Sequence, residues 1–142
     1  MGKAELKILM VEDQEEHVLI IKNALEQSER VQRIWVCKDG EEALDFLYNR
    51  GAFASKRTYP KPDVILLDLR LPKIDGLEVL KQIKADEQLK DIAVIVLTAS
   101  ERGEDIIEAY KDDVQSYILK SAVIVSKTGK MDGLLDAIHS IR

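Results

Sequence analysis

Val64-Ile65-Leu66-Leu67-Asp68 is the stretch of sequence that decides the fold, and Leu69-Arg70-Leu71-Pro72 follows it. Four consecutive apolar residues, bounded by a Pro-Lys-Pro-Asp segment and a later proline, are typical of a short strand buried on both faces. Because a lone buried charge is unfavourable, we expect Asp68 to emerge into a polar crevice. Open parallel sheets carry their chemistry in such crevices, at the carboxyl ends of the strands. The alternative is that Asp68 only caps the turn after the strand.

Length and composition indicate one ordinary globular domain. The chain has 142 residues, of which 46% are hydrophobic and 33% charged, enough for a single core. The net charge of −5 argues against nucleic acid as a partner, because phosphate backbones are bound by clustered Lys and Arg. The only cysteine, Cys37, can form no internal disulfide. Without a signal peptide or a long apolar run, we expect a cytoplasmic protein with no membrane partner.

Apolar runs predict four further strands, and helical spacing predicts five helices between and after them. The strands are expected at residues 7–11, 34–37, 93–97 and 117–119, and the helices at 18–25, 43–47, 76–83, 105–111 and 134–141. Asp13 and Glu16 have the spacing of a capping box for the first helix. Strands and helices that alternate in this way are typical of an α/β fold, in which helices cover both faces of a parallel sheet.

Polar residues stand at the ends of four of the five predicted strands. They are Glu12 and Asp13, then Asp68, Thr98 and Lys120, and in a parallel sheet they meet at one edge. Carboxylates held close together repel one another unless a cation is present. Hard oxygen ligands that leave part of the coordination shell open suit Mg²⁺, which keeps bound water and accepts a phosphate oxygen. The Lys120 amine and the Thr98 hydroxyl supply a positive charge and a donor for a tetrahedral anion at Asp68.

Each of these residues also has an ordinary structural explanation. Asp13 fits a helix cap, Glu12 a surface charge, Thr98 a β-forming residue and Lys120 a solvated strand end. Their joint presence at four strand ends favours a functional site.

The motifs around these residues match a known family. They are Glu12-Asp13, Leu66-Leu67-Asp68-Leu69 with Leu71-Pro72 and Asp75-Gly76, Leu97-Thr98-Ala99-Ser100, and Tyr117-Ile118-Leu119-Lys120. From Leu6 to Ile141 the chain resembles the receiver domains of two-component response regulators. The resemblance implies a three-layer α/β/α sandwich of flavodoxin-like topology, with a five-stranded parallel sheet in the order 2-1-3-4-5. Residues 1–142 are then expected to form a single receiver domain without a separate output domain.

The resemblance also assigns a role to the acidic residues. It implies that Asp68 accepts a phosphoryl group from the phosphohistidine of a histidine kinase. Glu12, Asp13, Asp68 and the backbone carbonyl of Arg70 would arrange Mg²⁺, with Glu12 acting through water. The protein would then be a signalling phosphoacceptor that catalyses only its own phosphorylation and dephosphorylation.

The remaining motif residues match those that respond to phosphorylation in the family. By the same resemblance, Lys120 pairs with the phosphoryl oxygens, the Thr98 hydroxyl moves toward the phosphate, and the Tyr117 ring follows it inward. The phosphoryl group adds a charge of roughly −2, which requires hydrogen-bond donors nearby. The movement of side chains that supplies these donors shifts the equilibrium between two conformations of the protein surface.

The long connection after the second helix resembles a subgroup of receiver-only regulators that includes partners of phytochrome-type kinases. Phe46-Leu47-Tyr48 precedes this connection and Tyr59-Pro60-Lys61-Pro62-Asp63 closes it. The implied partner is a sensor histidine kinase of that type or a phosphotransfer protein. A homodimer through the fourth helix, fifth strand and fifth helix is also implied, whereas no small organic ligand is expected.

Three features depart from the family pattern. Ser121 stands where the family usually has proline after the lysine, residues 122–130 lengthen the segment before the last helix, and Asp112-Asp113-Val114 replaces a more usual Gly-Ala.

Three other functions remain as alternatives. A Mg²⁺-dependent phosphohydrolase with Asp68 as nucleophile would need a carboxylate two residues later, where this chain has Arg70. A flavin or dinucleotide carrier would need glycines or hydroxyls where Val11-Glu12-Asp13-Gln14 offers acids. A degenerate receiver that is never phosphorylated is consistent with Ser121 in the place of the usual proline, but not with the presence of all three acids, Glu12, Asp13 and Asp68.

Overall fold

The fold is built on one five-stranded parallel sheet. A computed structural model of the chain describes residues 5–98, 116–119 and 138. The strand order is β2-β1-β3-β4-β5, and all neighbours run parallel. The strands are β1 (Leu6–Val11), β2 (Val31–Cys37), β3 (Val64–Asp68), β4 (Ala93–Thr98) and β5 (Ser116–Leu119). The predicted α/β class and strand order are confirmed.

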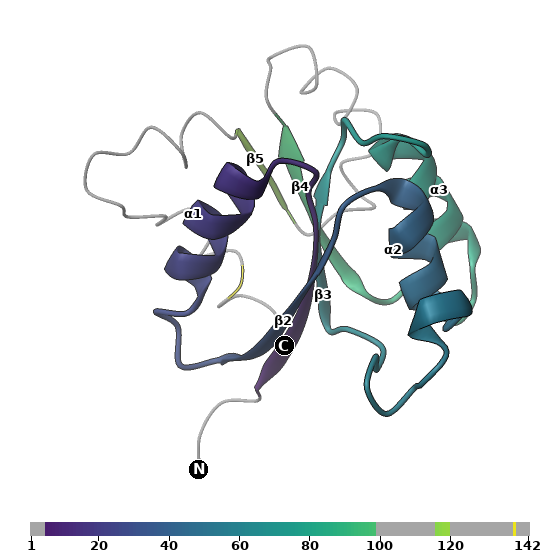
Figure 1. Cartoon of the computed structure of the whole chain (residues 1–142), viewed down its shortest axis with the longest axis horizontal. Coiled ribbons are helices and arrows are strands. Elements are labelled where there is room, and N and C mark those ends of the chain that lie inside the picture. The colour runs from purple at the N-terminus through teal and green to yellow at the C-terminus, as the bar shows by residue number, and fades with distance from the viewer. Residues whose placement is uncertain (1–4, 99–115, 120–137, 139–142) are drawn as a thin grey trace.

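Helices cover both faces of the sheet (Figure 1). One face carries α1 (Glu15–Leu25), and the other carries α2 (Gly40–Leu47) and α3 (Gly76–Ala85). This arrangement is the expected three-layer α/β/α sandwich. The helix predicted at 105–111 lies outside the described residues, and of the helix predicted at 134–141 only Ile138 is described, as a helical residue buried in the core beneath α1.

No helix in the described part of the chain is both long enough and apolar enough to cross a membrane.

The central strand β3 is buried on both faces, as its sequence predicts. Ile65 and Leu67 belong to the core under α2 and α3, whereas Val64 and Leu66 belong to the core under α1. All four side chains are 0% exposed, and each such burial stabilises the fold by about 1.5–3 kcal/mol. An unbroken apolar run is therefore what a strand in this position requires.

Two local predictions are wrong. Strand β2 begins at Val31 rather than Ile34, because it is an edge strand whose first residues are half-exposed or exposed and therefore include polar ones. Helix α1 has Gln14 as its N-cap residue, and no side chain caps it. Asp13 and Glu16 thus form no capping box.

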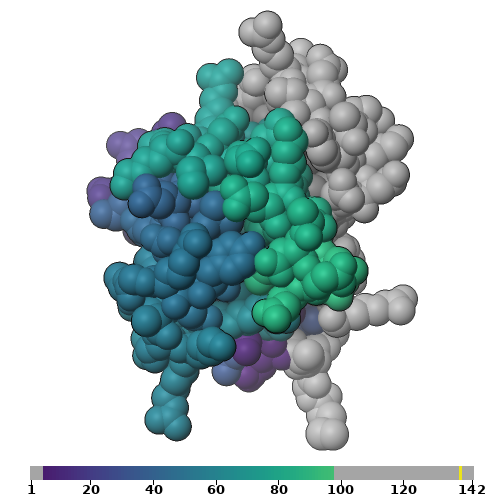
Figure 2. All heavy atoms as spheres, turned by 90° about the vertical axis from the view of Figure 1, so that its right-hand side faces the viewer, coloured from purple at the N-terminus to yellow at the C-terminus, as the bar shows by residue number. Residues whose placement is uncertain are grey.

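The long connection from α2 to β3 is held by aromatic side chains. After α2 it forms a short 3-10 helix, η1 (Gly51–Phe53). The Phe46 ring lies at 5.5 Å from the rings of both Phe53 and Tyr59, measured between centroids, and at 6.0 Å from that of Trp35. Figure 2 shows this side of the molecule from outside, with the blue surface that includes α2 beside the teal and green surface that includes α3. The loop is therefore part of the packed face.

The single cysteine yields a prediction about thiol reactivity. Burial raises the pKa of Cys37 from its ordinary value of 9.0 to about 12, with smaller contributions from nearby Glu42, Asp39 and Asp45. The thiolate fraction in the native protein is then roughly a thousandfold smaller than in the unfolded chain. We expect a disulfide reagent to modify Cys37 at pH 8 only after denaturation. Equal reaction rates in native and denatured protein would contradict this expectation.

The same shift predicts how stability depends on pH. Between about pH 9 and about pH 12 the unfolded chain has released the Cys37 proton and the folded chain has not. The free energy of unfolding therefore falls as pH rises through this window. In denaturant titrations over this range, Cys37→Ala should show a smaller fall than the wild type, and an equal fall would show that the thiol contributes nothing.

Candidate functional site

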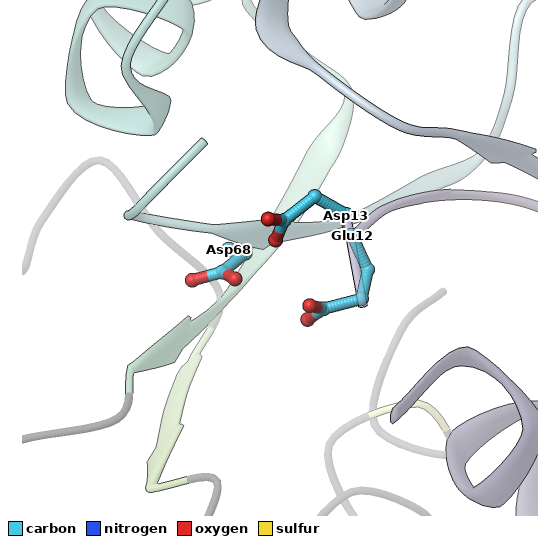
Figure 3. A group of neighbouring side chains, drawn as sticks. All are labelled: Glu12, Asp13 and Asp68. Atoms are coloured by element: carbon cyan, nitrogen blue, oxygen red, sulfur yellow. The ribbon is translucent and has the colours of Figure 1, made fainter. Parts of the chain in front are cut away.

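Three carboxylates meet at the carboxyl edge of the sheet. Strand β1 pairs with β3 so that Val11 lies opposite Leu67, and the next residue on each strand is acidic. One carboxylate oxygen from each of Glu12, Asp13 and Asp68 lies within 4.8 Å of the others. Figure 3 shows the Asp13 side chain extending from the end of β1 toward Asp68, with the Glu12 carboxylate beside them. The structure thus brings together the three acids that the sequence singles out.

Two of these acids have little contact with solvent. Glu12 is 1% exposed and Asp68 is 3% exposed, whereas Asp13 is an exposed residue. The Gln14 backbone N–H donates to Glu12 Oε1 at 3.2 Å, and His17 Nδ1 lies 3.7 Å from the same oxygen. The Glu12 carboxylate is therefore oriented by the first turn of α1.

The loop after β3 orients the Asp68 carboxylate. The Arg70 backbone N–H donates to Asp68 Oδ1 at 3.1 Å. The loop closes where the Gly76 N–H donates to the Leu69 carbonyl oxygen at 3.0 Å. A Cβ atom at Gly76 would overlap the Asp68 carbonyl oxygen, so this close approach requires glycine.

The donor set fits a hard divalent cation. All three side chains offer carboxylate oxygens, the ligands that Mg²⁺, Mn²⁺ and Ca²⁺ prefer. Two of the three carboxylates are almost completely buried, and a cation among them would offset the repulsion between their charges. The arrangement can therefore hold a metal ion beside Asp68.

Comparison with known proteins assigns the family. The sequence model of the family described as "Response regulator receiver domain" matches residues 8–135. The chain belongs to the response regulator receiver family. Among the alternatives drawn from the sequence, membership favours a receiver over a phosphohydrolase or a flavin carrier.

Two curated relatives illustrate the similarity of this receiver domain to others. It is 45% identical over 113 residues to the probable methanogenesis regulatory protein FilR2 of Methanothrix harundinacea, covering 80% of this chain and 70% of that protein. It is 40% identical over 114 residues to the response regulator Rcp1 of Synechocystis sp., covering 80% of this chain and 76% of Rcp1.

Solved structures of phytochrome response regulators match the fold. The phosphorylated cyanobacterial phytochrome response regulator RcpA superimposes with a TM-score of 0.81 at 38% identity, covering 98% of this chain and 97% of that one. The Mn²⁺-bound form of Rcp1 gives a TM-score of 0.70 at 37% identity, with 80% of each chain covered. The predicted resemblance of this receiver to the phytochrome-associated subgroup is confirmed.

The other predicted residues of the receiver site are placed only in part. Thr98 is the last residue of β4, and the backbone register sets it opposite Leu119 of β5. Tyr117 lies on the same neighbouring strand, opposite Val96. Lys120 and Ser121 lie outside the described residues. The roles of Thr98, Tyr117, Lys120 and the Arg70 carbonyl stay predictions.

Two features of the site were missed from the sequence. One is His17, whose position five residues after Glu12 is compatible with a contact but does not by itself indicate one. The other is a pocket of about 400 Å³ beside Glu12 and Asp13, with Leu19 of α1 and Val36 of β2 among its walls. Leu19 is 60% exposed, so apolar surface of α1 lies next to the acidic cluster.

The cluster predicts metal-dependent stability. Mg²⁺ at about a hundred times its dissociation constant should raise the free energy of unfolding by about 2.7 kcal/mol, because only the folded chain brings the carboxylates together. Asp13→Asn should lose most of this gain, and in metal-free buffer it should be at least as stable as wild type because one repulsive charge is gone. Thermal unfolding with and without Mg²⁺ measures both effects.

Asp91→Asn is the matched control for this experiment, since Asp91 is an exposed aspartate outside the cluster. It should keep the full Mg²⁺ effect. If wild type and Asp13→Asn gain equally from Mg²⁺, the ion does not bind at these carboxylates.

Proposed function

We propose that this receiver domain accepts a phosphoryl group on Asp68 from a histidine kinase, with Mg²⁺ bound beside it. The observation that carries the proposal is the meeting of Glu12, Asp13 and Asp68 at one edge of the sheet, with their carboxylate oxygens within 4.8 Å. Membership of the receiver family supports the same conclusion.

The proposed reaction is a transfer between two side chains. An oxygen of the Asp68 carboxylate attacks the phosphorus of a phosphohistidine and forms a P–O bond. The P–N bond breaks, and the histidine nitrogen keeps its electron pair. Such transfers depend mainly on positioning and on neutralising charge. The hydrogen bond from the Arg70 N–H to Asp68 Oδ1 orients this carboxylate for the attack.

The residues proposed to hold Mg²⁺ are Glu12 acting through water, Asp13, Asp68 and the backbone carbonyl of Arg70. When bound, the ion supplies positive charge that offsets the charge of the transferring phosphoryl group. The hard oxygen donors of the cluster support this choice of metal. The Mn²⁺-bound structure of the relative Rcp1 supports a divalent ion in general.

The phosphoryl group is proposed to act on a protein-binding surface through three residues. Lys120 pairs with the phosphoryl oxygens, the Thr98 hydroxyl moves toward them, and Tyr117 follows. The backbone positions of Thr98 and Tyr117 on the neighbouring strands β4 and β5 support coupling between the two.

The proposed partners are proteins. The phosphodonor is a sensor histidine kinase, of the phytochrome type by similarity to RcpA, or a phosphotransfer protein. Its approach to Asp68 would pass the pocket beside Glu12 and Asp13, where exposed Leu19 offers apolar contact surface. A homodimer through the fourth helix, fifth strand and fifth helix, which the resemblance to receiver domains implies, is a further proposal. Size-exclusion chromatography with and without phosphorylation tests it.

Mass spectrometry of the intact protein tests phosphoryl acceptance. After incubation with acetyl phosphate and Mg²⁺, we expect wild type to gain the mass of one phosphoryl group, and to gain almost none when the metal is chelated. The adduct should be lost in base, as expected of an acyl phosphate. Asp68→Asn should show no adduct, because an amide is a poor nucleophile.

Asp91→Asn controls for the loss of an aspartate elsewhere and should be phosphorylated like wild type. An adduct on Asp68→Asn would place the phosphoryl group on another residue. No adduct on wild type, together with no response to beryllofluoride, would indicate a receiver that works without phosphorylation.

A separate variant tests the proposed switch. Thr98→Ala should still accept a phosphoryl group on Asp68, because the hydroxyl is not the nucleophile. It should lose most of the phosphorylation-induced change in the amide chemical shifts of Ser116–Leu119, which form β5. Nuclear magnetic resonance of the phosphorylated wild type and variant measures this change. Equal shifts in both proteins would show that Thr98 does not transmit the signal.

A further inference from the structure

The loop that follows Asp68 is held at its far side by the turn that opens α2. The loop, residues 69–75, begins at the phosphoacceptor and ends at Gly76. In Figure 1 the teal segment after β3 runs beside the blue segment that leads into α2. The Gly40 backbone N–H donates to the Pro72 carbonyl oxygen at 3.4 Å, which joins the two segments directly.

Gly40 is packed against this loop more closely than any side chain would allow. A Cβ atom at position 40 would overlap the Ile74 carbonyl oxygen and would lie 2.8 Å from the Ile74 Cβ. Real Cβ contacts of this kind do not occur, and the loop backbone would have to move. The absence of a side chain at position 40 thus sets how near the loop lies to α2.

The tip of the loop has a strained backbone. The Ile74 N–H donates to the Pro72 carbonyl oxygen at 2.8 Å, which closes a three-residue turn. Its central residue, Lys73, has a φ of 66°, in the left-handed region that favours glycine. A strained turn persists only where its surroundings hold it.

Charged residues around Gly40 help to hold the turn. Lys73 Nζ lies 3.8 Å from Asp39 Oδ2 and 3.8 Å from Glu41 Oε2. Asp39 is itself fixed, since its Oδ1 accepts from the Glu42 N–H at 2.7 Å as the N-cap of α2. The start of α2 therefore contacts the loop through backbone, steric and charged contacts.

We propose that Gly40 is a positioning residue for phosphoryl acceptance at Asp68. By fixing residues 72–74 it fixes the loop that carries Arg70, whose N–H donates to Asp68 Oδ1 at 3.1 Å. A side chain at position 40 displaces the loop, weakens that hydrogen bond and turns the Asp68 carboxylate away from its place in the acidic cluster. The expected effect on the phosphorylation rate rests on the proposed function, whereas the expected displacement of the loop does not.

Gly40→Ala tests this role with two readouts. In metal-free protein, the Arg70 amide should exchange with solvent roughly tenfold faster than in wild type. At saturating Mg²⁺, the rate of phosphorylation by acetyl phosphate should fall on the order of tenfold to a hundredfold, as small displacements of reacting groups can do. Far-ultraviolet circular dichroism establishes that the variant is folded.

Gly51→Ala is the matched control. Gly51 has a φ of 56°, so alanine is strained there, but among the described residues nothing lies within 4 Å of the position of its Cβ. This variant should lose thermal stability while keeping the wild-type exchange of the Arg70 amide and the wild-type rate. It separates general destabilisation from displacement of the loop.

The outcomes distinguish this inference from the proposed function. If wild type is not phosphorylated, the proposed function fails, and amide exchange still decides whether Gly40 positions the loop. If a folded Gly40→Ala matches wild type in both readouts, the positioning role is overturned.

If Gly40→Ala does not fold, amide exchange in the wild type decides. The Gly40 N–H, which donates to the Pro72 carbonyl oxygen, should then be protected from exchange as strongly as the Arg70 N–H. A rapidly exchanging Gly40 N–H beside a protected Arg70 N–H overturns the role.

Discussion

Repulsion between two nearly buried carboxylates is the constraint on which the site depends. Glu12 and Asp68 end adjacent strands, and their nearest oxygens lie within 4.8 Å. At the effective dielectric of a protein, two full charges at this distance repel by roughly 3 kcal/mol. Backbone N–H groups of Gln14 and Arg70 each donate to one of these carboxylates. They orient the oxygens but carry no full positive charge, and a cation bound at the cluster would offset this repulsion.

The sheet holds the acids in place because its central strands cannot slip. Ile65 and Leu67 face one core, and Val64 and Leu66 face the other. In a strand buried on both faces, a shift by one residue would exchange the two sets and also move Asp68, the last residue of β3, out of its place in the acidic cluster. The apolar run that predicts the strand therefore also fixes where its carboxylate stands.

The sequence predicted the elements that depend on local pattern and missed those that depend on contacts between distant segments. Strand β3 and the acidic edge follow from an apolar run and the residues that end it. The start of β2 at Val31 was missed because an edge strand does not need a continuous apolar run. The packing of Gly40 against Ile74, 34 residues further along the chain, has no signature in local sequence.

The failed capping box carries information of its own. Asp13 has the residue type and the position next to α1 to cap it, yet the cap residue is Gln14 and no side chain caps the helix. A cap contributes about 1 kcal/mol to stability, and Asp39 makes such a cap at α2. The aspartate at the start of α1 instead lies within the acidic cluster. Asp13 therefore contributes to the acidic cluster and not to a helix cap, which is a departure from the local capping rule at the candidate site.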